Sequence, residues 1–258
     1  TGSAPAAAPA IASLAKLNGQ APARRALDIQ RWNTAEGARV LFVEARELPM
    51  FDLRLTFAAG SSQDGDASGL AMLTNAMLNE GVPGKDTSAI AAGFEDLGAD
   101  FSNGSYRDMA LAGLRSLSEK DKRDAALKLF DQVIGQPTFP EEALTRIKNQ
   151  VLAGFEYQKQ NPGKLAALAL FKQLYGDHPY ARSSDGDEHS VPKITTAQLR
   201  AFHQKAYAAG NSVIALVGDL SRAEAEAIAA QVSASLPKGP ALPPTVAPQV
   251  PKAGVTHI

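Results

Sequence analysis

Short segments typical of strands recur along the chain between longer segments of helical periodicity. Residues 39–45 and 51–58 are rich in β-branched and aromatic side chains, and residues 100–105 and 109–117 are two further candidate segments, separated by residues 106–108. We expect each of these segments to form a strand. Residues 212–217 (SVIALV) form an uninterrupted apolar run, which is typical of a central strand.

The helical segments have apolar residues at intervals of three and four, and most begin at a residue that suits a helix N-cap. The predicted helices are 69–80, 88–97, 118–134, 141–159, 164–175, 197–208 and 222–235. The expected caps are Ser68, Asp86 or Thr87, Thr195 or Thr196, and Ser221. The order of strands and helices indicates an α/β or α+β fold with a largely antiparallel sheet.

Composition divides the chain into a main domain with flanking segments. Residues 1–28 open with an Ala- and Pro-rich sequence, which predicts a flexible lead-in. This opening fits either the mature end of an exported protein or a remnant of an expression tag. Residues 29–236 form the predicted domain, and the proline-rich residues 237–254 are typical of a linker. Residues 255–258 resemble the start of a strand in a further domain, cut short.

The charge balance and the absence of cysteine exclude several classes of function. Lys and Arg number 26 and Asp and Glu number 27, so the chain lacks the excess of basic residues expected of a nucleic-acid-binding surface. Disulfides, thiolate metal sites and a cysteine nucleophile are excluded because the chain has no cysteine. No apolar stretch is long enough to suggest a membrane span.

One predicted helix carries a recognisable motif. The segment 69–81 (GLAMLTNAMLNEG) resembles the active-site helix of the M16 metallopeptidases, the pitrilysin, insulinase and mitochondrial processing peptidase family. The family pattern is Gly-x-Ala-His-x-x-Glu-His-Met-Leu-x-x-Gly. Its matching residues here are Gly69, Ala71, Met77, Leu78 and Gly81. Met72 stands in place of the first histidine, Asn75 in place of the glutamate and Ala76 in place of the second histidine.

These replacements remove the chemistry of the motif. In the family, the histidines bind zinc from one helical face and the glutamate polarises the attacking water. A methionine thioether binds Zn²⁺ weakly beside imidazole, and alanine offers no donor atom. An asparagine amide accepts no proton at neutral pH.

Other segments extend the resemblance over most of the chain. The family's third ligand is a glutamate in a segment similar to residues 151–154 (VLAG), where Gly154 occupies the ligand position. Residues 178–180 (HPY) resemble a family loop, and residues 199–218 resemble a helix–strand segment through Tyr207, Asn211 and Gly218.

The resemblance implies an α+β, M16-like domain with a mostly antiparallel sheet packed with helices. It implies a non-catalytic subunit without a cofactor, in which Met72, Asn75, Ala76 and Gly154 mark lost motif positions. We expect a zinc-bearing M16 partner in a heterodimer that handles peptides in the periplasm or another exported compartment. The alternative is a scaffold protein that kept the fold without peptide processing.

Strand 100–105 is the candidate peptide-binding element. In catalytic relatives, the matching strand lies at the sheet edge beside the zinc helix, and substrate adds to it as a further strand. Phe101, Ser102 and Asn103 are therefore the candidate contact residues. The alternative is an ordinary edge strand protected by polar neighbours.

Some residues favour a structural interpretation. Met72 and Met77 lie among leucines at helical spacing, which is typical of core packing. Residues 185–189 (DGDEH) fit either a solvated acidic loop or a partial Ca²⁺ or Zn²⁺ site. We expect His178 to stabilise its loop.

Overall fold

The computed structural model describes residues 26–249 and residue 254. Its centre is a six-stranded sheet in the order β1-β2-β8-β3-β7-β6. The strands are β1 Gln30–Asn33, β2 Arg39–Glu44, β3 Met50–Phe57, β6 Asp100–Ser105, β7 Ala110–Leu117 and β8 Ser212–Gly218. All neighbours are antiparallel except β2 and β8, which run parallel. The expected strands are confirmed, and the short β1 was not predicted.

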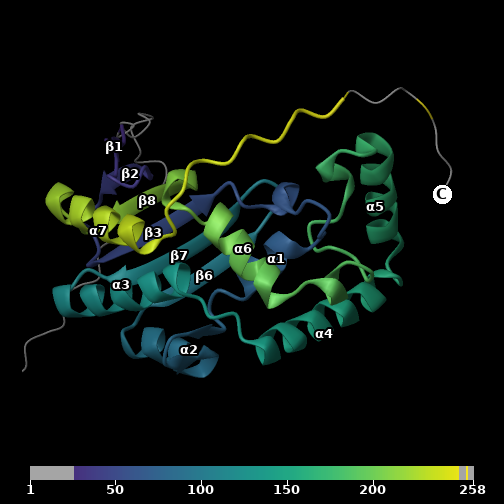
Figure 1. Cartoon of the computed structure of the whole chain (residues 1–258). Coiled ribbons are helices and arrows are strands. Elements are labelled where there is room, and N and C mark those ends of the chain that lie inside the picture. Colours follow the sequence, from purple (N-terminus) through teal and green to yellow (C-terminus); the bar gives the residue numbers. More distant parts are fainter. Residues whose placement is uncertain (1–25, 250–253, 255–258) are drawn as a thin grey trace, which may run out of the picture.

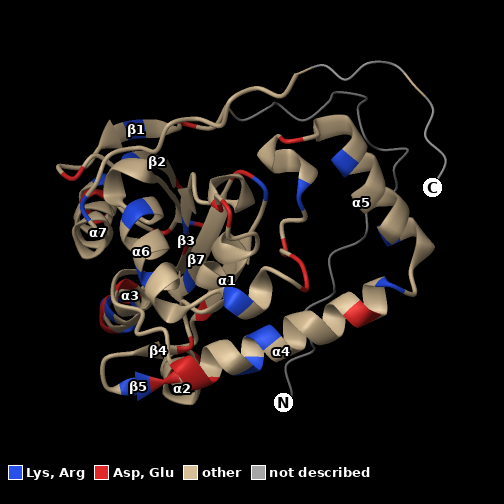
Figure 2. Ribbon diagram, turned by 45° about the vertical axis from the view of Figure 1, so that its right-hand side comes forward, with Lys and Arg blue, Asp and Glu red and all other residues tan. Residues whose placement is uncertain are grey.

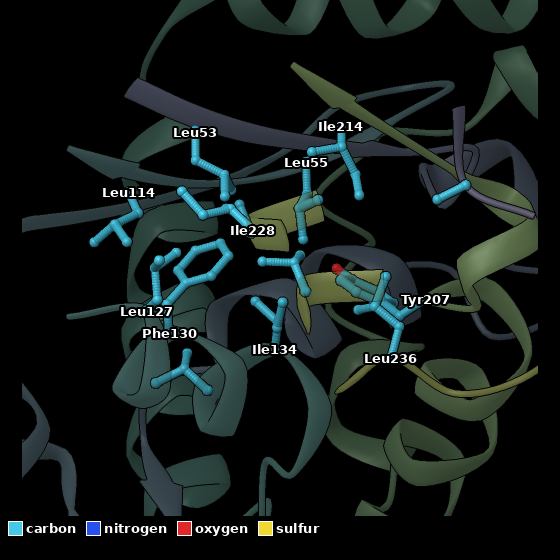
Figure 3. Close-up of a cluster of buried hydrophobic side chains, with 14 of the residues drawn as sticks. Leu53, Leu55, Leu114, Leu127, Phe130, Ile134, Tyr207, Ile214, Ile228 and Leu236 are labelled. Carbon is cyan, nitrogen blue, oxygen red and sulfur yellow. The ribbon is translucent and has the colours of Figure 1, made fainter. Parts of the chain in front are cut away.

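Helices pack against one face of the sheet. Along β3, Phe51, Leu53 and Leu55 are buried, whereas Asp52 and Arg54 on the alternate face are exposed. The buried set follows from the period of two in a strand. Figure 3 shows sheet leucines facing aromatic and aliphatic side chains from the helices, which together form the main core.

The helices occupy the expected segments, with differences at their ends. They are α1 Leu70–Ala76, α2 Thr87–Asp96, α3 Lys120–Gly135, α4 Glu141–Gln158, α5 Pro162–Tyr175, α6 Thr196–Ala206 and α7 Arg222–Ser235. The caps at Asp86, Thr195 and Ser221 are confirmed by side-chain hydrogen bonds to backbone N–H groups. A short hairpin of β4 Gly81–Val82 and β5 Lys85–Asp86 precedes α2.

The motif helix is shorter than predicted. We expected residues 69–80, but α1 ends at Ala76, and the following residues turn through hydrogen bonds of Leu78 and Glu80 to carbonyls three residues back. Gly81 then enters β4. The prediction was wrong because the leucines and methionines of this segment belong to a turn that packs in the core, which periodicity does not distinguish from a helix.

A second apolar cluster lies around α1, α4 and α6. It contains the buried residues Leu73, Met77, Phe139, Leu144, Ile147 and Leu199 among others. Since Ala71 and Leu78 pack in the main core, α1 lies between the two clusters. The motif helix is therefore at the junction of the sheet with the α4 region (Figure 1).

Helix α5 lies apart from both cores. It contains no buried residue, and Figures 1 and 2 show it beyond the far end of α4. Leu165, Leu168 and Leu170 are exposed on it.

The first part of the proline-rich segment follows the surface of the domain. Ala209 N donates to Pro237 O, and Leu242 N donates to the Asn211 side chain at 3.0 Å. Residues 237–249 form neither helix nor strand. Residues 1–25 of the expected lead-in and the expected strand at 255–258 lie outside the described residues.

Candidate functional site

Asp64 fixes the beginning of α1. Its carboxylate accepts hydrogen bonds from Gly69 N at 2.8 Å and Ala71 N at 2.7 Å. Gly69 is the N-cap with φ of 98°, a left-handed conformation that favours glycine. The predicted cap at Ser68 was therefore wrong, because a buried carboxylate from the preceding turn supplies the oxygen. Burial raises the pKa of Asp64 to about 6, although the backbone donors and Arg182 lower it.

Two of the replaced motif positions contribute to apolar packing. Met72 and Ala76, four residues apart on α1, are partly buried against the second apolar cluster. Val151 and Leu152 of α4 pack against the same cluster. The interpretation of Met72 and Met77 as packing residues is confirmed.

Asn75 is buried and joins three elements through hydrogen bonds. Its amide nitrogen donates to Leu111 O of β7 and to the hydroxyl of Tyr207, both at 3.1 Å. Its backbone carbonyl accepts from the Asn103 amide of β6 at 2.8 Å. Tyr207 is fully buried, and burial raises its pKa well above the usual value. This position therefore holds a neutral structural network that has no group able to act as a base at neutral pH.

Gly154 lies on α4 beside open space. A Cβ atom at this position would meet no heavy atom within 4 Å. A larger side chain could be accommodated here, but glycine itself provides no ligand.

The donor atoms at these positions do not fit a zinc ion. Zinc in proteins takes imidazole, thiolate or carboxylate ligands, whereas these positions hold a thioether, an amide and two residues without donor side chains. Over residues 26–249 and 254, no group of three or more His, Cys, Asp or Glu side chains is placed to hold a metal ion. We therefore derive no metal-dependent step for this chain.

Strand β6 is an edge of the sheet, beside α1. Phe101 is partly buried and stacks on Phe94 of α2, with ring centroids 5.6 Å apart. Ser102 is exposed, and Asn103 is exposed with its amide nitrogen bonded to Asn75 O. The amide oxygen of Asn103 makes no hydrogen bond within the described part of the chain. The structure thus brings Asn103 to Asn75, whereas Phe101 contributes mainly to the core.

The loop containing His178 ties α5 to the β6–β7 hairpin. Nδ1 of His178 accepts from Tyr180 N at 3.1 Å, and Nε2 is 2.6 Å from Val246 O. The Tyr180 hydroxyl donates to Asp108, and the Arg107 guanidinium lies 4.3 Å from the centre of the Phe171 ring. His178 therefore has the structural role that we expected.

The acidic loop at 185–189 has protein partners for two of its carboxylates. Asp187 accepts hydrogen bonds from the backbone N–H groups of His189 and Ser190, both at 2.8 Å. Glu188 forms an ion pair with Lys159 at 2.8 Å. These contacts support the interpretation as a solvated loop.

Comparison with known proteins assigns the family. A family model described as insulinase, peptidase family M16, matches residues 39–188. A second model, described as the peptidase M16 inactive domain, matches residues 193–258. The chain belongs to peptidase family M16. No helix in the described part of this M16 chain combines the length and apolar character needed to cross a membrane.

Relatives differ in how they are described. A Helicobacter pylori protein described as non-peptidase homolog YmxG is 30% identical over 198 residues, covering 76% of this chain and 45% of the relative. An uncharacterized zinc protease of Rickettsia felis is 22% identical over 214 residues, covering 81% of this chain and 52% of the relative. This M16 chain spans about half the length of these curated relatives.

Solved structures confirm the α+β, M16-like fold. The peptidase M16 inactive domain from Pseudomonas fluorescens has 74% identity and a TM-score of 0.87, covering 88% of this chain and 55% of that chain. The periplasmic protease PqqL from Escherichia coli has 20% identity and a TM-score of 0.74, covering 86% of this chain and 26% of that chain. The second likeness shows the fold alone.

Proposed function

We propose that this chain is a non-catalytic M16 subunit that binds extended peptide segments while a zinc-bearing M16 subunit hydrolyses them. The observation that carries the proposal is the chemistry of α1, where Met72, Asn75 and Ala76 occupy the motif positions. Gly154 on α4 supplies no third ligand. The description of one relative as a non-peptidase homolog supports the same conclusion.

The edge position of β6 supports the peptide-binding part of the proposal. An extended peptide can add to a sheet edge through main-chain hydrogen bonds, and this mode does not need catalytic side chains. Asn103 lies at that edge, held by its contact with Asn75 O. Its amide oxygen is then available to accept a hydrogen bond from a bound peptide.

The surface of α5 supports the presence of a partner. Leu165, Leu168 and Leu170 are exposed on this helix. Its charged residues are only Lys164 and Lys172, and Figure 2 shows no acidic residue along it. Contiguous exposed apolar surface commonly marks an interaction site. We propose that a zinc-bearing M16 subunit covers it, and that the complex works in the periplasm or a comparable exported compartment, as the name of PqqL suggests for that relative.

The first experiment measures hydrolysis and binding together. The purified chain is tested with fluorescent peptides alone, and then mixed with a zinc-bearing M16 subunit. We expect peptide binding but no hydrolysis by the chain alone, and faster hydrolysis by the mixture than by the partner alone. Stoichiometric zinc bound at α1 and α4, with hydrolysis by the isolated chain, would refute the proposal.

A matched pair of variants tests whether peptide binds at the β6 edge of the sheet. Asn103→Ala removes the amide at β6, and Asn33→Ala removes an exposed asparagine from β1 at the opposite edge. We expect only Asn103→Ala to weaken peptide binding. If the chain binds no peptide, yet assembles with a partner, a scaffold role is supported instead.

A further inference from the structure

Helix α5 is attached to the rest of the molecule at few places. It has no buried residue, and its C-terminal half meets the tip of the β6–β7 hairpin through the contact of Arg107 with Phe171. The loop that follows α5 is held by the same arginine, because Arg107 Nη1 donates to Tyr180 O at 2.9 Å. The placement of α5 therefore depends on the loop at residues 178–181.

The proline-rich segment 237–249, which we call the strap, is fixed to the sheet domain at its beginning. Gly210 N donates to Gly239 O at 3.1 Å, and Leu242 packs against the main core. A Cβ atom on Gly210 would lie 2.3 Å from Gly239 O, so glycine is needed for this close approach of the two backbones. Residues 237–242 are therefore part of the packed domain.

Beyond Leu242, the strap makes one further hydrogen bond within the described residues, between Val246 O and Nε2 of His178 at 2.6 Å. Val246 is 80% exposed, so this bond rather than side-chain packing holds the strap at that point. Pro243 and Pro244 lie between the two attachment points and restrict the backbone there, since each fixes φ. Figure 1 shows the strap, in yellow, running from the sheet domain toward α5.

The two contacts of His178 require the same tautomer of its ring. Nδ1 accepts from Tyr180 N at 3.1 Å, so Nδ1 carries no proton. The ring proton of the neutral imidazole is then on Nε2, and Val246 O is an acceptor within reach of it. One nitrogen therefore binds the loop and the other binds the strap.

We propose that His178 is a latch that holds α5 and the strap in one relative placement. The strap is fixed to the sheet domain at Leu242, and the loop that carries His178 is fixed to the hairpin through Arg107. Because coupling between two sites is reciprocal, a protein that binds α5 would alter the course of the strap, and a shift of the strap would move α5. The latch rests on the proposed function only for the identity of that protein, a zinc-bearing M16 subunit.

Two amide side chains of different length separate the roles of the two ring nitrogens. In His178→Asn, the amide oxygen can replace Nδ1 and accept from Tyr180 N, as an asparagine cap does, but no donor reaches Val246 O. In His178→Gln, the longer side chain can place a donor near the position of Nε2. His189→Asn is the control, since His189 is exposed and its ring makes no hydrogen bond within the described residues.

The distance between the strap and α5 is measured by double electron–electron resonance. Spin labels are attached to Ala247→Cys on the strap and Lys172→Cys on α5, both exposed positions in a chain without other cysteines. We expect wild type, His178→Gln and His189→Asn to give one predominant narrow distance. In His178→Asn the distribution should broaden, and the ratio of latched to released molecules should fall about fivefold, the factor that one net hydrogen bond supplies.

Three results would overturn the latch. They are a broad distribution in wild type, an unchanged one in His178→Asn, and equal broadening in the Asn and Gln variants, which would assign the effect to packing of the His178 ring on Tyr180. If His178→Asn fails to fold, the double variant Pro243→Gly and Pro244→Gly tests the same latch without changing His178. A more flexible strap should also broaden the distribution, and no change would count against the latch.

Addition of a zinc-bearing M16 subunit tests the coupling to a partner. We expect His178→Asn to assemble with it about fivefold more weakly than wild type, whereas His189→Asn should assemble as wild type does. Equal assembly of all variants would mean that the latch does not govern α5. If wild type does not assemble with the subunit at all, the proposed function is wrong, while the distances measured in the isolated chain still decide the latch.

Discussion

At the scale of single residues, Asn75 shows how a motif position can be taken over by structure. A glutamate at this position would have to ionise beside the buried hydroxyl of Tyr207, where loss of solvation is costly. The amide is neutral and donates to Tyr207 and to Leu111 O. Asn75 therefore joins α1 to β7 and to Tyr207 at the end of α6.

Asn75→Ala is expected to destabilise the chain by about 2 kcal/mol, because the Leu111 carbonyl and the Tyr207 hydroxyl lose a buried partner. The measurement is equilibrium unfolding in urea. Asn79→Ala is the control, since the Asn79 side chain makes no hydrogen bond within the described residues, and it should change stability by less than about 0.5 kcal/mol. Equal effects of the two substitutions would argue against the network.

Asp131 should give the stability of this chain a pH dependence. Burial raises its pKa to about 6 from the ordinary 3.8, although Gln231 and Ser235 donate hydrogen bonds that lower it. A raised pKa in the folded state favours folding at pH below about 4, and this contribution is lost as the pH rises through about 6.

Asp131→Asn removes that titration. Between about pH 4 and pH 7, wild type should lose up to about 3 kcal/mol of stability relative to the variant. Urea unfolding at several pH values measures the difference. Parallel stability profiles for the two proteins would contradict the assignment.

At the scale of elements, α1 depends on its surroundings more than on its own sequence. It is seven residues long, which is too short for a stable isolated helix. Asp64 caps it from the preceding turn, and two apolar clusters hold its opposite sides. The helix is therefore a product of tertiary contacts.

Asp64→Ala should cost about 1–2 kcal/mol in urea unfolding, because the N–H groups of Gly69 and Ala71 lose their acceptor. Ser68→Ala tests the alternative cap. The Ser68 hydroxyl makes no hydrogen bond within the described residues, so this change should have a small effect of less than about 0.5 kcal/mol. If Ser68→Ala destabilised the chain more than Asp64→Ala did, Ser68 would be the residue that caps α1 in solution.

Restoring the four motif residues tests whether α1 and α4 are still placed to bind one zinc ion together. The quadruple variant Met72→His, Asn75→Glu, Ala76→His and Gly154→Glu should gain zinc affinity, since α1 contacts α4 and the space at Gly154 is open. Elemental analysis after dialysis against a weak chelator measures bound zinc. The triple variant that keeps Gly154 is the control and should bind zinc more weakly. No gain in the quadruple variant would show that the scaffold no longer supports the site.

At the scale of the whole molecule, the unusual feature is the contrast between the packed sheet domain and α5. The strands and the helices on the sheet share a large core, whereas α5 has no buried residue. We propose that a partner surface covers this apolar helix, because exposed apolar surface commonly marks an interaction site. The chain aligns with about half the length of the curated relatives.

The double variant Leu165→Gln and Leu168→Gln should weaken assembly with a zinc-bearing M16 subunit about tenfold or more, because exposed leucines three apart share one helical face. Leu48→Gln is the control, since Leu48 is exposed on the turn between β2 and β3. Sedimentation velocity of the mixed proteins measures assembly. Unchanged assembly of the double variant would exclude α5 from the interface.

Much of the element pattern of this protein was predictable from sequence. β-Branched and aromatic residues indicated β3, and capping residues such as Asp86, Thr195 and Ser221 marked helix starts. These signals are local, because strand and helix periods and N-cap hydrogen bonds involve residues close together in the chain. The replaced residues of the zinc motif could be recognised for the same reason, because most of the motif lies within one short segment, residues 69–81.

Only the tertiary structure decided which of these elements meet. It placed Asp64 at the start of α1, joined Asn75 to Tyr207 across 132 positions, and stacked Phe101 on Phe94. Local patterns report which face of an element is apolar, but they do not name the partner that covers it. Partners are selected by the packing of distant segments, and for that reason the end of α1, its true cap and the exposure of α5 could be known only from the folded chain.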